Sequence, residues 1–332
     1  MALHVTDYML KLAKDLQEKK GATESTAETY IRTLVTLNDK QPFKSLMFLK
    51  KTDAVMDRMK DYALSTRKNM VAAAASVLNL YEQPGYKKTY QFYSDKLKEM
   101  HADLDEKRGD TLQKTEKEEK NWIAWEDVEK KRDELKAEVD KFASQKSVTI
   151  KQYNQLLSYL LLCLYTYLPP RRNQDYQEVW VVREWKESMP TDRNYLDLHG
   201  QQFVFNKYKT AKASGQQRVE IPDNELKDAI VMYLKHNPHY RASKNKSNEY
   251  RFLCKADGTP LTVVNAITRI LNKVFGRNIG SSMLRHSYLS KKYGAVMEDM
   301  REDAELMAHG LDVQKTYIRG GAAPSLDVIE LV

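Results

Sequence analysis

Five side chains in the second half of the chain are of types that can bind an anion, move protons and attack an electrophile. Guanidinium groups bind phosphate or carboxylate through a planar fork of donors, lysine and histidine transfer protons, and a tyrosine hydroxyl can act as a nucleophile. Each residue alone is a weak signal, because a single arginine after a helix is usually a surface cation and a single histidine is usually packed or solvated. Their occurrence in order within one region favours a shared site. In chain order they are Arg172, Lys209, Arg285, His309 and Tyr317.

The first two of these residues follow elements that can hold them in place. Arg172 comes after the most apolar helix predicted in the chain, over 150–168, and after a Pro-Pro turn. Lys209 lies in the basic, glycine-containing segment 206–215, which is typical of a hairpin tip between two short strands.

The other three residues lie in predicted helices or close behind them. Arg285 is part of the string Leu-Arg-His-Ser within a helix predicted over 281–293. His309 ends a Met-Ala-His string after a further helix predicted over 300–308, and Tyr317 follows eight residues later.

This arrangement resembles the tyrosine recombinase (integrase) superfamily over essentially the whole chain, in a form similar to the integrases of large DNA viruses and mobile elements. Members have an arginine ahead of an acidic residue, a hairpin lysine, a His-x-x-Arg motif, a histidine box and a nucleophilic tyrosine. Arg172 stands three residues before Asp175 and matches the first arginine better than Arg171 does. Lys209 matches the hairpin lysine, with Lys212 as a second candidate. The remaining matches are Arg285, His309 and Tyr317.

The resemblance implies DNA cleavage and rejoining through a covalent 3′-phosphotyrosine, with no metal, cofactor or ATP. Tyr317 would attack the phosphorus and release a 5′-hydroxyl. Arg172 and Arg285 would neutralise the nonbridging oxygens, because each guanidinium stays charged and offers several donors. Lys209 would protonate the leaving oxygen, and His309 would hydrogen-bond the phosphate.

One position departs from the family pattern. Ser282 stands three residues before Arg285, where the family has a histidine, and serine cannot accept a proton near neutral pH as imidazole can. His286 lies on the same helix face as Ser282, but the family usually packs a histidine at that position, so a substituting base is the weaker interpretation. Ser282 also supports an alternative, a DNA-binding protein derived from a recombinase and no longer catalytic. A second alternative is a type IB-like DNA topoisomerase, which shares the catalytic fold but works as a monomer.

Length and charge favour two domains joined by a charged segment. The chain has 332 residues with 54 Lys+Arg against 46 Asp+Glu, a net charge of +8. Residues 101–145 carry a net charge of −4, which leaves +12 on the flanking regions. We expect a helical core-binding domain over 1–102, a charged, partly helical linker over 103–146, and a catalytic domain with a C-terminal tail over 147–332. The predicted fold class is mainly α with a small antiparallel sheet, the catalytic domain being mixed α+β.

Basic residues on both sides of the linker favour double-stranded DNA as the partner. Arg67 and Lys68 lie near the start of a helix that the sequence predicts from Ser65, and helix N-termini suit phosphate contacts. Lys207 and Lys212 add positive charge to the predicted hairpin.

Other features limit the class of protein. Two cysteines argue against a disulfide scaffold or a thiolate metal site. No segment predicts a membrane span and the N-terminus lacks a signal pattern, so we expect an intracellular protein.

The segment 326–332 is apolar, and the resemblance implies that this tail docks on a neighbouring protomer in a tetramer on DNA.

Overall fold

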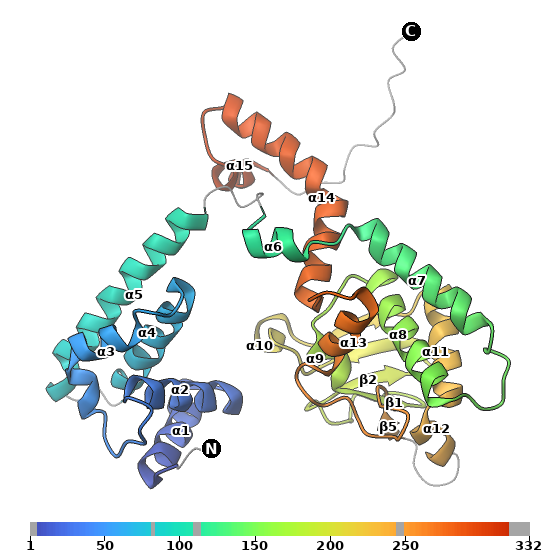
Figure 1. Cartoon of the computed structure of the whole chain (residues 1–332), viewed down its shortest axis with the longest axis horizontal. Helices are drawn as coiled ribbons and strands as arrows, with labels where there is room; N and C mark the ends of the chain where they lie inside the picture. The colour runs from blue at the N-terminus through green and yellow to red at the C-terminus, as the bar shows by residue number, and fades with distance from the viewer. Residues whose placement is uncertain (1–4, 81–83, 109–113, 244–248, 319–332) are drawn as a thin grey trace. The chain divides into compact units, whose positions relative to one another are not determined.

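The structure is a computed structural model that describes residues 5–80, 84–108, 114–243 and 249–318. The chain divides into two units, residues 1–111 and 112–332, each with its own hydrophobic core (Figure 1). A search of the described segments finds no helix with the length and apolar character needed to cross a membrane.

The first unit consists of helices and loops in its described part. Helix α4 packs against α2 and α5, and the small side chains of Ala73, Ala74 and Ala75 allow this close approach. Residue 102, the predicted end of the first domain, lies inside α5. The elements are α1 (Asp7–Lys20), α2 (Glu24–Leu37), the 3-10 helix Met47–Lys50, α3 (Thr52–Met59), α4 (Leu64–Leu78), the 3-10 helix Pro84–Tyr86 and α5 (Lys87–Arg108).

The second unit is built around one buried helix, α8 (Ile150–Thr166). Thr149 begins it with a capping box, in which Gln152 and Thr149 each bond the other's backbone N–H. Helices α7 and α11 pack on α8, and Val128 and Val139 of α7 join its core. The helices are α6 (Glu116–Asn121), α7 (Trp125–Asp140), α8, α9 (Asn173–Gln177), α10 (Ala211–Ser214), α11 (Glu225–His236), α12 (Pro238–Ser243), α13 (Ala266–Phe275), α14 (Ser281–Leu306) and α15 (Leu311–Tyr317).

The described residues of the second unit form a mixed five-stranded sheet, so the prediction of an antiparallel sheet is wrong for one strand pair. The first two strands run parallel, with Val179 opposite Asn194. They can do so because residues 183–193 bring the chain back to the end of the sheet at which the first strand began. The predicted hairpin is present, with antiparallel strands and α10 at its tip. The strand order is β4 (Gln217–Glu220), β3 (Gln202–Phe205), β2 (Asn194–Asp197), β1 (Val179–Val182) and β5 (Glu249–Arg251).

The structure also differs from the sequence-based prediction in the region after residue 280. The two helices predicted over 281–293 and 300–308 form one continuous helix, α14. No proline interrupts the sequence between them, and Gly294 within the helix costs only about 1 kcal/mol relative to alanine. Arg301 forms ion pairs with Glu298 and Glu305 on the same helix, which support its distal half.

Candidate functional site

The turn after α8 places two adjacent arginines in different surroundings. Pro170 cannot continue the helical hydrogen bonds of α8, and α9 begins only at Asn173. Arg171 is turned toward the protein, since its side chain is only 16% exposed and its Nε donates to Oδ2 of Asp175 at 3.0 Å. Arg172 is the extended N-cap of α9, and among the described residues no hydrogen bond engages its side chain. Arg172 is therefore the arginine of this turn whose donors are available to a ligand.

Arg172 interacts electrostatically with Asp175 on α9 and with Arg285 on α14. Burial lowers the pKa of Arg285, and the positive charge of Arg172 lowers it further, while Asp175 acts in the opposite direction. Burial raises the pKa of Asp175 although Arg171, Arg172 and Arg285 all oppose this rise. Within the described structure, the buried Oδ1 of Asp175 has no hydrogen-bond partner. Two guanidiniums close together repel each other, so an anion that contacts both is stabilised here.

Arg285 is fixed in the first turns of α14, next to the serine that departs from the family pattern. Its Nε donates to the backbone oxygen of Ser281 at 3.2 Å, and its Nη2 donates to Oγ of Ser282 at 3.1 Å. Leu284, which is fully buried, anchors this part of the helix in the core. Residue 282 therefore lies in direct contact with the guanidinium of Arg285.

His286 is not packed inside the protein, in contrast to the position expected from the family. Its side chain is 57% exposed, and its Nε2 lies 3.6 Å from Oε1 of Glu118 on α6. A polar pocket of about 430 Å³ lies beside this pair. The pocket is lined by Thr115, Glu118, Asn121, Thr268, Asn278, Gly280, Ser281, Ser282, Met283 and His286.

The predicted hairpin carries its lysines on the surface. Lys209 is exposed and follows β3, as predicted, and Lys212 is exposed on α10. Lys207 is also exposed, but its Nζ lies 3.4 Å from a carboxylate oxygen of Glu178. Of the two lysines considered for the leaving oxygen, Lys209 follows the end of β3 at Phe205 and Lys212 lies on α10.

His309 and Tyr317 lie side by side, but away from the two arginines. Their ring centroids are 5.8 Å apart, and the Tyr317 side chain is 67% exposed. Arg285 lies near the first residue of α14 and His309 follows its last residue, so at about 1.5 Å per residue roughly 30 Å of helix separates them. In the described structure, the predicted site is thus divided into an arginine cluster and a histidine–tyrosine pair.

Asn194 also belongs to this region, although its sequence position did not indicate it. It is fully buried at the start of β2, and its amide bonds the backbone of α9 and of the hairpin. A single asparagine at the start of an apolar segment does not by itself indicate that its side chain links two backbone segments. The available signal was a polar residue at a predicted strand end, which commonly serves as a turn residue instead.

The basic residues predicted to bind DNA in the first unit lie on α4. Arg67 and Lys68 are half-buried, and Nε of Arg67 is buried without a hydrogen-bond partner among the described residues. Helix α4 begins at Leu64 after Ala63, which provides no side-chain cap, so its first N–H groups are not satisfied by a capping side chain.

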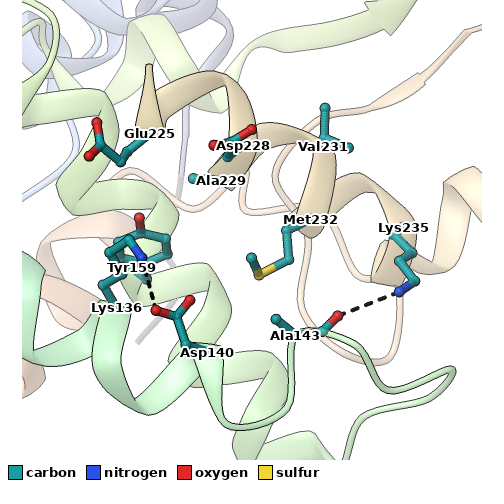
Figure 2. Close-up of a pocket in the computed structure, with 10 residues that line it drawn as sticks. All are labelled: Lys136, Asp140, Ala143, Tyr159, Glu225, Asp228, Ala229, Val231, Met232 and Lys235. Carbon is teal, nitrogen blue, oxygen red and sulfur yellow. Dashed lines mark hydrogen bonds and ion pairs between the residues drawn. The ribbon is translucent and has the colours of Figure 1, made fainter. Parts of the chain in front are cut away.

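A second pocket and the side chain of His239 lie outside the predicted site. The pocket in Figure 2, of about 390 Å³ between α7, α8 and α11, contains none of the predicted site residues; Lys136 in it pairs with Asp140 at 2.8 Å. His239 bonds the backbone oxygen of Gly258 at 2.6 Å. Over the described residues, no group of three or more histidine, cysteine, aspartate or glutamate side chains could hold a metal ion.

Comparisons of this chain with protein-family models, with curated proteins and with solved structures find no match. A functional assignment therefore depends on the residues and geometry of the chain itself.

Proposed function

We propose that this chain is a DNA strand-cutting and rejoining enzyme of the tyrosine recombinase type, acting as an integrase or site-specific recombinase. The observation that carries the proposal is that Arg172 and Arg285 both act electrostatically on the buried carboxylate of Asp175, and that Arg172 acts on Arg285. The two arginines belong to separate elements, and the positive charge of Arg172 contributes to the lowered pKa of Arg285. A phosphodiester has two nonbridging oxygens and one negative charge, so it can accept donors from both guanidiniums and relieve their repulsion.

The proposed reaction uses the remaining candidates in defined roles. The hydroxyl oxygen of Tyr317 attacks the phosphorus, and the bond between phosphorus and the 5′-oxygen breaks. Lys209 donates a proton to that leaving oxygen, and the phenol proton passes to water, since Ser282 cannot take it near neutral pH. His309 donates a hydrogen bond to the phosphate. The phosphotyrosine bond retains the energy of the broken bond, so rejoining needs no ATP.

This reaction requires Tyr317 to meet the arginines, from which a long stretch of α14 separates it. Either α14 bends, or Tyr317 serves the arginines of a second protomer on the same DNA. A mixture of Arg285→Ala and Tyr317→Phe distinguishes these arrangements. The mixture cleaves much faster than either variant alone if the tyrosine acts in a second protomer, and no faster than the Arg285→Ala variant alone if it acts within its own chain.

The test of the proposed function is a covalent trapping experiment on a pool of nicked DNA duplexes of random sequence. Cleavage near the nick releases a short strand, so the enzyme cannot rejoin the DNA and stays attached to it. We expect an adduct that survives denaturing electrophoresis and forms without ATP. Arg172→Ala and Arg285→Ala should each slow its formation on the order of 10²-fold or more, as for loss of one charge-stabilising donor.

Tyr317→Phe should abolish the adduct while DNA binding is retained. Tyr293→Phe is the matched control, because Tyr293 is 47% exposed on α14 and has no role in the proposed reaction. DNA binding by the wild-type protein without any adduct would contradict the proposal and favour a DNA-binding protein that has lost catalysis.

A further inference from the structure

The guanidinium of Arg171 connects three elements of the second unit. Its Nε donates to Oδ2 of Asp175 on α9 at 3.0 Å, and its Nη1 donates to Oε1 of Gln217 on β4 at 2.8 Å. The plane of the guanidinium lies over the ring of Phe205 on β3, 3.8 Å from its centroid, and it lies 5.2 Å from the ring centroid of Tyr208. Arg171 therefore contacts both strands of the hairpin and the carboxylate beside the other two arginines.

Asn194 makes a second connection between the same parts. Its Nδ2 donates to the backbone oxygen of Asp175 at 2.8 Å and to that of Lys207 at 2.9 Å. Its Oδ1 accepts from the backbone N–H groups of Asn206 at 2.9 Å and Lys207 at 2.7 Å. All four hydrogen-bonding positions of this buried amide are used, three of them on Asn206 and Lys207, which lead into the hairpin loop.

We propose that Arg171, Gln217 and Asn194 are positioning residues that hold the hairpin bearing Lys209 in register with the phosphate-binding arginines. The inference rests on the proposed function, in which Lys209 protonates the leaving oxygen. Lys209 is exposed and lies in a loop, so its own contacts cannot fix where its amine stands. The contacts of Arg171 with Phe205 and Gln217, the paired strand residues next to the loop, fix the loop from which Lys209 projects, and Asp175 fixes Arg171.

This role has a chemical signature that a general loss of stability does not share. A DNA strand with sulfur in place of the bridging 5′-oxygen leaves as a thiolate, which needs no proton because thiols have a pKa of about 8.5. A variant whose defect is a misplaced proton donor therefore cleaves the sulfur substrate normally. A variant that lacks a phosphate-binding arginine remains slow on both substrates.

The experiment measures single-turnover cleavage of the oxygen and sulfur forms of one nicked duplex. Gln217→Leu removes the hydrogen bond that joins Arg171 to β4 and leaves Arg171, Asp175 and Lys209 in place. We expect it to slow cleavage of the oxygen form tenfold or more and to cleave the sulfur form at the wild-type rate. Lys209→Ala should behave in the same way, and Arg172→Ala should be slow on both forms. Arg171→Lys, which keeps the charge but not the fork, should show the same selective defect as Gln217→Leu.

Urea unfolding of each variant, followed by tryptophan fluorescence, checks that the fold is retained. A Gln217→Leu protein that is folded and cleaves both forms as fast as wild type would overturn the inference, and so would one that is equally slow on both forms. In either case wild-type cleavage would leave the proposed function standing. A wild-type protein that cleaves neither form would instead refute the proposed function, and with it this inference.

Discussion

Replacing Asn194 with alanine should destabilise the second unit by about 2–4 kcal/mol. The substitution leaves four backbone groups without their partner: the N–H groups of Asn206 and Lys207 and the carbonyl groups of Asp175 and Lys207. Each lost hydrogen bond costs about 1 kcal/mol net, and more where the group stays buried. Three of the four bonds are only partly buried, so water can replace some of them, which gives the lower end of the range.

The chain offers a direct measurement of this cost. Its four tryptophans are Trp122, Trp125, Trp180 and Trp185, all in the second unit, so urea unfolding followed by tryptophan emission reports on that unit. Asn154→Ala is the matched control, because Asn154 is exposed on α8 and should change stability by less than about 0.5 kcal/mol. A loss below about 1 kcal/mol for Asn194→Ala would show that the amide does not hold the hairpin and α9 together.

Three further predictions concern residues around the arginine cluster and the end of the chain. Ser282→His should raise the cleavage rate at pH 7, because the new imidazole would stand beside Arg285. The rate of wild-type cleavage should rise with pH toward the ordinary tyrosine pKa of about 10. A wild-type rate that does not change with pH, and that the substitution does not alter, would refute this prediction. The backbone N–H and hydroxyl of Thr115, with His286, hold the pKa of Glu118 below its ordinary value of 4.5. The ionised Glu118 therefore stabilises the fold above pH 4.5, and this stabilisation is lost as pH falls through the lower pKa of the folded state. Glu118→Gln should reduce the loss of unfolding free energy at acid pH in urea titrations, and an unaltered loss would show that another group causes it. Deleting the residues after Ala323, a segment outside the described residues, should reduce paired-duplex complexes in native gels but preserve binding of one protomer to DNA, and unchanged pairing would exclude the tail from assembly.

The parts of the fold that were predicted correctly depend on local patterns. The apolar run after Thr149 predicts the buried α8, and the Pro-Pro turn predicts where it ends. The basic segment around Lys209 predicts a hairpin tip, which the structure contains. Such features follow from neighbouring residues, so one sequence is enough to place them.

The parts that were not predicted depend on contacts between distant segments. Strands at 179–182 and 194–197 have the same apolar pattern whether they pair parallel or antiparallel, so the sequence leaves their direction open. Arg171 and Arg172 are identical in type, and only packing against Phe205 and Gln217 decides which of them turns inward.

The continuity of α14 is a further feature that local pattern did not settle. Gly294 suggests a helix end, but the helix continues to Leu306. The consequence for the site is large, because the predicted nucleophile then lies at the far end of a long helix from Arg285. Sequence order alone predicts membership of a site, and it does not give the conformation in which its members meet.

The central claim is that Tyr317 becomes covalently linked to DNA. The most direct measurement is to trap the adduct on nicked duplex DNA, digest the protein and the DNA, and identify the modified peptide by mass spectrometry. We expect a nucleotide joined through its 3′-phosphate to Tyr317. A nucleotide joined to Tyr288 or Tyr293, both of which lie closer to Arg285 along α14, would contradict it.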